Sequence, residues 1–125
     1  MNHPWITIGA VFGGVAVGAG AFGAHGLKAM LDAHGHSATW ETAARYAMYH
    51  GLALVALGML APARSAVPGL VACAGWCFVL GTAIFSGCLA ALALTGLRPL
   101  GAVVPIGGVL LIAGWALFAV AAARG

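Results

Sequence analysis

Four side chains in this sequence have the types and the spacing that chemistry inside a protein core requires. Tyr46 and His50 are four residues apart, so on a helix they lie one above the other on the same face. His25 and Ser86 are expected at the same end of the protein. A neutral imidazole can relay a proton, bind a quinone or ligate a metal. The alternative is a polar clasp, in which hydrogen bonds among the four side chains fix the register of the helices.

The sequence favours the clasp over a cofactor site. Two histidines without a carboxylate are an incomplete metal site, and no four-ligand Cys/His spacing is present. We therefore predict neither a metal nor another cofactor. Further polar residues are expected at the same end, namely Glu41, Arg45, Thr95 and Arg98. His36, in contrast, is expected to be solvated.

Motifs of hydrolytic enzymes are missing from the sequence. It has no nucleophile elbow, phosphate-binding loop or H-E-x-x-H helix. Asp32 and Glu41 are its only acidic side chains, so paired carboxylates would require both to converge from one loop. We do not expect a hydrolase, and we assign no catalytic residue.

The elements that position these residues must lie in a membrane. Of 125 residues, 63% are hydrophobic and 6% are charged, and the mean hydropathy is +1.07. Soluble domains carry about 25% charged residues, so this composition requires the bilayer as solvent. Five basic residues are too few for a nucleic-acid-binding surface.

Four apolar segments are long enough to cross a bilayer, which needs about 20 residues per helix. Their short connections predict one membrane domain over residues 1–125, an all-α, up-down-up-down four-helix transmembrane bundle. A short interfacial helix is expected between the first two spans, where Leu27, Met30 and Leu31 recur at helical spacing. The spans are expected at about residues 4–24, 42–60, 68–94 and 101–123.

Glycines predict where helices approach one another closely. Gly9 and Gly13 form one G-x-x-x-G pair and Gly14 and Gly18 form another, and Gly23 continues this small surface. Gly87 is expected to serve the same purpose in the third span. Because one small chain offers few helices to cover these glycines, we expect a homo-oligomer or a larger membrane complex.

Four stretches together resemble a known family. They are GAFGAHGL at 20–27, YAMYHGLAL at 46–54, GTAIFSGCLAALALTG at 81–96 and VPIGG at 104–108. The sequence is similar to the proteins grouped as domain of unknown function 423, which are related to transmembrane protein 256. The resemblance covers nearly the whole chain. It implies a four-span membrane protein with no characterised activity, and its motifs include His25, Tyr46, His50 and the FSG triplet at 85–87.

The sequence departs from the family pattern at three positions. Ala47, Cys88 and Val104 each stand where the family commonly has a polar residue. The loss of three polar groups at one end argues against a catalytic pocket in this member.

These observations predict a structural, scaffold or accessory protein of the membrane. One alternative is a redox or cofactor protein that binds a quinone, haem or metal at the His25/His50 end, and another is a small transporter. The expected location is a bacterial inner membrane, with cytoplasmic termini next to Arg64 and Arg124. The clasp further predicts that His25 and His50 both point into the bundle, each with a polar partner from another span.

Overall fold

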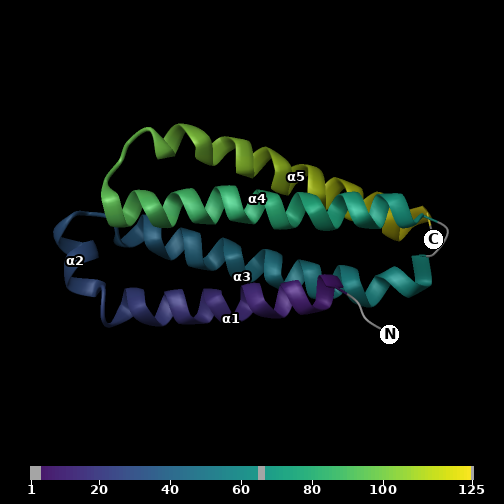
Figure 1. The fold of residues 1–125 in the computed structure, drawn as a ribbon, viewed down its shortest axis with the longest axis horizontal. Helices are drawn as coiled ribbons and strands as arrows, with labels where there is room; N and C mark the ends of the chain where they lie inside the picture. The colour runs from purple at the N-terminus through teal and green to yellow at the C-terminus, as the bar shows by residue number, and fades with distance from the viewer. Residues whose placement is uncertain (1–3, 65–66, 125) are drawn as a thin grey trace.

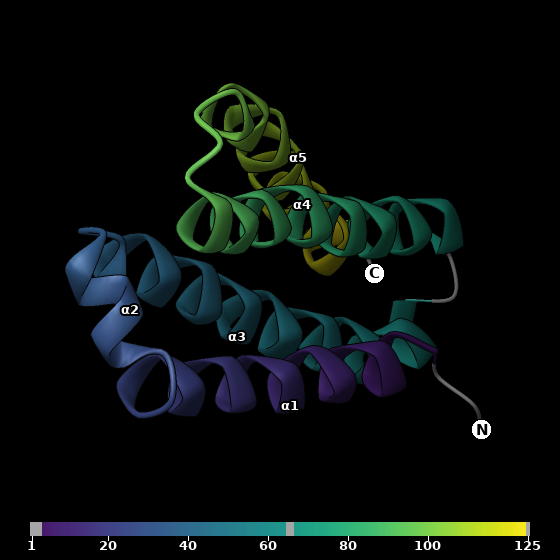
Figure 2. The same ribbon diagram turned by 60° about the vertical axis from the view of Figure 1, so that its left-hand side comes forward.

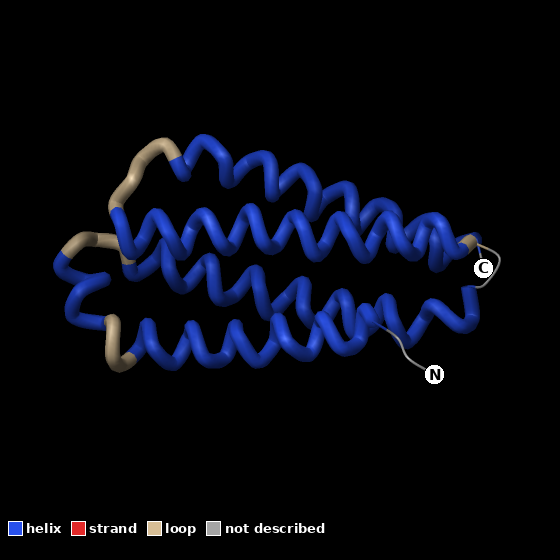
Figure 3. Tube along the Cα trace, in the orientation of Figure 1, coloured by secondary structure: helices blue, strands red, loops and turns tan. Residues whose placement is uncertain are grey.

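Four long helices that alternate in direction carry most of the chain in the computed structural model, which describes residues 4–64 and 67–124 (Figure 1). Loops and short helical turns join them at the two ends, and the described residues contain no strand (Figure 3). The elements are α1 (Pro4–Ala24), α2 (Lys28–Ala33), α3 (Ser37–Leu60), the 3-10 turn η1 (Ala61–Arg64), α4 (Pro68–Thr95) and α5 (Leu100–Arg124).

The four long helices are each long and apolar enough to cross a membrane. The expected all-α, four-span fold with a short helix after the first span is therefore confirmed. The third candidate span, α4, begins with Pro68 in its first turn and ends at Thr95, and the next residue, Gly96, has a φ of 70°. Proline lacks only an N–H that the first turn leaves unpaired, and glycine adopts the left-handed conformation that terminates a helix.

The second span starts earlier than its apolar segment suggests. We expected it from about residue 42, and the helix α3 begins at Ser37. Hydropathy indicates which residues enter the bilayer, whereas a helix continues as long as its backbone hydrogen bonds do. The polar first turn of α3 therefore extends the span beyond its apolar part.

The helices form two antiparallel pairs, α1 with α3 and α4 with α5, which are joined where α3 packs on α4 (Figure 2). Within each pair the backbones meet at two glycines. A methyl group built on Gly9 would lie 2.5 Å from the carbonyl oxygen of Gly51, and one built on Gly107 would lie 2.8 Å from that of Gly81. Glycine thus permits a backbone approach that a methyl group would prevent.

The predicted glycine surface on α1 is only partly correct. Gly9 packs on α3, Gly23 packs against the ring of Trp40, and Gly13 is only loosely packed. A methyl group added to Gly14, Gly18 or Gly87 would have no described heavy atom of another helix within 4 Å, so these three glycines do not seat another described helix of this chain. The reason is geometric: successive helical residues are about 100° apart, so Gly14 and Gly18 lie on a different face from Gly9 and Gly13.

The apolar core lies where α3 and α4 meet. Phe78, Leu54 and Leu57 are fully buried there. Trp5, at the start of α1, packs its indole ring against Gly75 of α4. These contacts hold α1, α3 and α4 together at the end of the molecule where α1 begins.

Candidate functional site

His50 is the most thoroughly enclosed polar side chain of the predicted cluster, with 4% of its surface exposed. Its Nδ1 lies 2.7 Å from the carbonyl oxygen of Tyr46, one turn earlier on α3. Its Nε2 lies 3.1 Å from the indole Nε1 of Trp115 on α5. An indole nitrogen can only donate, so Nε2 accepts and Nδ1 carries the proton that is donated to the carbonyl. A neutral imidazole in this single tautomer satisfies both bonds.

Aromatic rings surround the imidazole. The ring centroids of Tyr46, Phe78 and Trp115 lie 6.1, 5.7 and 5.9 Å from that of His50. Phe85 packs on Tyr46 with a centroid separation of 4.7 Å. Tyr46, Phe85 and Trp115 line a groove of about 460 Å³ beside His50, where α3, α4 and α5 meet. Because both ring nitrogens are already bonded, His50 presents no free lone pair to this groove.

The expected position of His25 is wrong. It is exposed in the turn after α1 and makes no side-chain hydrogen bond within the described residues. The helix α1 ends at Ala24, so His25 lies in the turn that leads to α2 and not on the face of α1 that packs on α3. His50 therefore has its partner from another span, as predicted, but the partner is Trp115 and not His25.

The sequence did contain a signal for Trp115. Trp115 lies nine residues before the end of α5 at Arg124. An indole N–H at that depth needs an acceptor, and few side chains of this sequence can provide one. The pairing with His50 follows from that requirement only once α3 and α5 are known to be neighbours.

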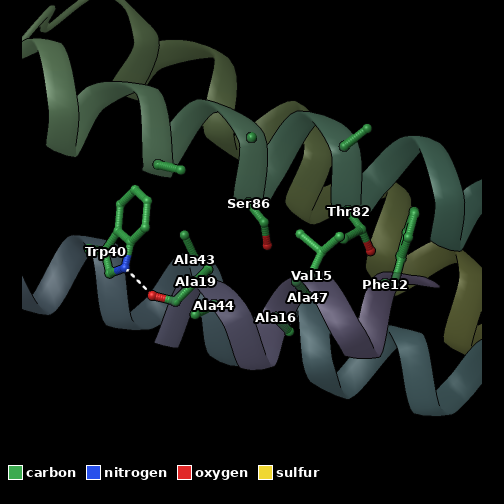
Figure 4. Close-up of a pocket in the computed structure, with 13 residues that line it drawn as sticks. Phe12, Val15, Ala16, Ala19, Trp40, Ala43, Ala44, Ala47, Thr82 and Ser86 are labelled. Carbon is green, nitrogen blue, oxygen red and sulfur yellow. Dashed lines mark hydrogen bonds between the residues drawn. The ribbon is translucent and has the colours of Figure 1, made fainter. Parts of the chain in front are cut away.

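Ser86 is buried, as expected, but it belongs to a different site. With Thr82, one turn earlier on α4, it lines a crevice of about 260 Å³ between α4 and the α1/α3 pair. Figure 4 shows both hydroxyl groups directed from α4 toward the other two helices. The opposite wall consists largely of alanines, and Trp40 lies at one end, its Nε1 donating to the carbonyl oxygen of Ala19 over 2.7 Å.

Neither crevice hydroxyl has a hydrogen-bond partner among the residues that the structure describes. Ser86 is 8% exposed and Thr82 is 5% exposed, and both oxygens are buried. Hydroxyl groups in helices commonly donate to the carbonyl four residues earlier, and Thr42 and Thr95 do so over 2.9 and 2.6 Å. A buried hydroxyl without a partner costs about 1–3 kcal/mol. Thr82 was not predicted, because threonine in an apolar run gives no sign that its hydroxyl is unpaired.

The remaining predicted polar residues lie at the surface and do not converge on His50. Glu41 and Arg45 form an ion pair with each other on the exposed side of α3. Thr95 accepts a hydrogen bond from the backbone N–H of Leu97 and so helps to end α4. Arg98 is exposed in the following turn. An exposed ion pair contributes at most about 1 kcal/mol, so these residues define the polar end of the molecule and not a reaction centre.

His36 makes a hydrogen bond to another helix that was not predicted from the sequence. It is half-buried, and its Nδ1 lies 3.1 Å from the carbonyl oxygen of Ala93 near the end of α4. The bond joins the start of α3 to the end of α4. Its expected solvation was wrong because the sequence does not reveal that these two helix ends meet.

One carboxylate of the short helix α2 contributes to its attachment to α3. Asp32 accepts hydrogen bonds from the Lys28 ammonium, at 2.9 Å, and from the hydroxyl of Ser37. The bond from Lys28, followed by that from Ser37, lowers the pKa of Asp32 below its usual value. The Asp32 carboxylate in turn raises the pKa of Lys28. Both shifts reflect a charged pair within α2, and the hydrogen bond from the Ser37 hydroxyl links its carboxylate to α3.

Metal-binding residues do not gather at either site. Within residues 4–64 and 67–124, no group of three or more His, Cys, Asp or Glu side chains is placed to hold an ion. Among the described residues that line the aromatic groove, His50 is the only His, Cys, Asp or Glu, and none of those lining the crevice is of these types.

Comparison with known proteins supports the membrane assignment. The model for a family of proteins of unknown function, DUF423, matches residues 19–108. A UPF0382 membrane protein of Staphylococcus saprophyticus is 46% identical over 116 residues, covering 93% of each chain. One from Staphylococcus haemolyticus is 48% identical over 111 residues, covering 89% of this chain and 88% of its own. The UPF0382 membrane protein YwdK of Bacillus subtilis is 41% identical over 120 residues, or 96% of each chain. No solved structure matches this chain.

Proposed function

This chain belongs to the DUF423 family of membrane proteins, and we propose that it is a structural or accessory component of the membrane in which it resides. The observation that carries the proposal is the closed hydrogen bonding of His50. Its two ring nitrogens are bonded to Tyr46 and Trp115, so the imidazole serves to connect α3 with α5.

A redox or cofactor protein is the competing function. To ligate a haem iron or a metal, His50 would have to release Nε2 from the Trp115 indole. That exchange would leave an indole N–H unpaired inside the membrane, which costs about 1–3 kcal/mol before any ligand is bound. No carboxylate or second histidine lies beside His50 among the described residues of the groove, and one imidazole is an incomplete ligand set for a zinc-type metal ion.

Absorbance and metal analysis of the purified protein distinguish the two functions. We expect no visible absorption band and substoichiometric metal in the protein extracted from its own membrane in mild detergent. Trp115→Phe is the matched variant, since it frees Nε2 and keeps an aromatic ring. A stoichiometric metal or haem in the parent protein, lost in His50→Asn, would contradict the structural function.

An accessory component needs a partner, and we propose that this chain assembles with itself or with other membrane proteins. Gly14 and Gly18 support this, because they lie on a face of α1 that no described helix of this chain covers. Crosslinking in native membranes tests the assembly, and a product that is only monomeric would count against it. We further propose that the termini are cytoplasmic, and alkaline phosphatase activity from a C-terminal fusion would reverse that orientation.

A further inference from the structure

The crevice between α4 and the α1/α3 pair has the features of a binding site that is separate from His50. It opens toward lipid, because Val15 on α1 and Ala83 and Gly87 on α4 line it and are exposed. Its walls are almost entirely apolar. At its base are two polar atoms, the buried and unpaired hydroxyl oxygens of Thr82 and Ser86.

These two hydroxyls differ from others of their kind in this protein. Thr42 and Thr95 lie near helix ends and are bonded to their own helices, so they need no further partner. Thr82 and Ser86 could have bonded in the same way and instead face the crevice from consecutive turns (Figure 4). Two donors one turn apart on a single face can reach the same acceptor group.

The depth of the hydroxyls restricts what that acceptor can be. Ser86 and Thr82 precede the end of α4 at Thr95 by nine and thirteen residues, which corresponds to about 13 and 20 Å along the helix. Both therefore lie within a hydrocarbon core about 30 Å thick. Phospholipid ester groups and bulk water stay near the surface of that core, so the partner must itself dissolve in lipid.

We propose that the crevice binds a lipid-soluble, ring-sized carbonyl compound of the quinone class. The molecule enters laterally from the bilayer between α1 and α4 with a carbonyl oxygen foremost. The hydroxyls of Ser86 and Thr82 donate hydrogen bonds to that oxygen. The ring lies against the alanines of α1 and α3 and beside the indole of Trp40, in a space of about 260 Å³. The proposal concerns binding alone and does not depend on the function of His50.

Tryptophan fluorescence tests the binding directly, because a quinone quenches an indole that it contacts. The full chain in detergent is titrated with menadione. We expect saturable quenching that is largely lost in Trp40→Phe and retained in Trp115→Phe, whose ring lines the other groove. Methylnaphthalene is the matched competitor, since it has the shape of menadione without the carbonyl groups. Because it forms no hydrogen bond with the hydroxyls, it should relieve the quenching only at about tenfold excess over menadione.

The hydroxyls are tested with near-isosteric variants. Ser86→Ala combined with Thr82→Val should weaken menadione binding by about tenfold and abolish the preference over methylnaphthalene. Thr42→Val and Thr95→Val remove hydroxyls that are bonded elsewhere and should leave binding unchanged. Should the double variant fail to fold in a thermal-unfolding control, the single variants are titrated, and each should weaken binding by a smaller factor.

Several outcomes would overturn the proposal. Equal quenching of the parent and of the hydroxyl variants would mean that the hydroxyls bind no carbonyl. Equal competition by methylnaphthalene would reduce the crevice to an unspecific apolar surface. A photoreactive residue in place of Ala83 that crosslinks two copies of the chain would show that a second copy covers the crevice.

Discussion

The two polar sites of this membrane protein are built in opposite ways. At His50, every donor and acceptor of the imidazole has a partner within the chain, so the groove of about 460 Å³ beside it meets no unpaired imidazole nitrogen. At Ser86 and Thr82, two hydroxyls remain without partners among the described residues, and small side chains leave a space in front of them. Burial and an adjacent space are common to both sites. The unpaired hydroxyls are what distinguish the crevice, and the proposal of a ligand rests on them.

The difference has an energetic consequence. A polar group in hydrocarbon stabilises the fold only when it is bonded, and it destabilises the fold when it is not. His50 should therefore contribute to the stability of the unliganded protein, whereas the two crevice hydroxyls should reduce it. Substitutions at the two sites are expected to change the free energy of unfolding in opposite directions.

The largest effect should come from the contact that holds the crevice wall in place. In Gly9→Leu, the new side chain would overlap the backbone of α3 at Gly51, because even a methyl group there lies too close. We expect a loss of about 3 kcal/mol or more in the free energy of unfolding, measured by denaturant titration in detergent. Gly14→Leu is the matched control on the outward face of α1 and should have little effect. Similar losses in both variants would contradict the packing of α1 described above.

The next effect concerns His50. His50→Ala removes the acceptor of the Trp115 N–H and leaves a void among the aromatic rings, so we expect a loss of about 2 kcal/mol. His50→Asn retains a donor and an acceptor and should cost less. Thermal unfolding of the three proteins checks this order. An asparagine variant as unstable as the alanine variant would show that the imidazole has a role beyond connecting α3 and α5.

At the crevice, substitution of the hydroxyl residues is expected to raise the free energy of unfolding. Ser86→Ala with Thr82→Val removes two unpaired hydroxyls and should stabilise the ligand-free protein by about 1 kcal/mol. The measurement is the same thermal unfolding, made after extensive delipidation. With menadione present the order should reverse, since only the parent protein gains hydrogen bonds on binding. Destabilisation in the absence of any ligand would mean that the hydroxyls are bonded within the chain.

The smallest effect should be at the surface, where α2 is attached to α3. The pKa of Asp32 is lowered in the folded protein, so its contribution to stability is present above its unfolded pKa and is lost as the pH falls through the folded value. Hydrogen exchange of the α2 amides, corrected for the intrinsic pH dependence, should therefore gain protection as the pH rises from below the folded pKa of Asp32 to about 5, one unit above the unfolded pKa. Asp32→Asn should abolish this gain. If the pH profile of protection is the same in Asp32→Asn as in the parent protein, the carboxylate does not contribute to holding α2.

The polar residues at the α2 end of the molecule provide a further contrast with both buried sites. Glu41 and Arg45 form an exposed ion pair with each other, and His25 is exposed. Read from the sequence, these residue types resembled those of a functional cluster. Exposure makes their interactions weak, so the chemistry that the sequence suggested at this end is not assembled there.

The sequence by itself determined the solvent, the number of spans and their order. Those properties depend on composition and on the length of apolar runs, which act locally and need no knowledge of neighbours. It also indicated that His50 would face another span, because an imidazole inside a helix of this kind is costly when it faces lipid. The sequence also contained the G-x-x-x-G pairs, which predicted the close packing of Gly9.

Only the tertiary structure decided which partners meet. The bond from Trp115 to His50 joins residues 65 positions apart, and it depends on the rotation of α5 about its axis. The close packing at Gly51 and Gly107 also depends on how the helices are rotated about their axes. So does the crevice that Ser86 and Thr82 share with Trp40. Apolar sequences of uniform hydropathy do not specify such rotations, because lipid and protein are equally favourable surroundings for leucine and alanine. Shape complementarity and a few hydrogen bonds make the choice, and both exist only once the helices are packed.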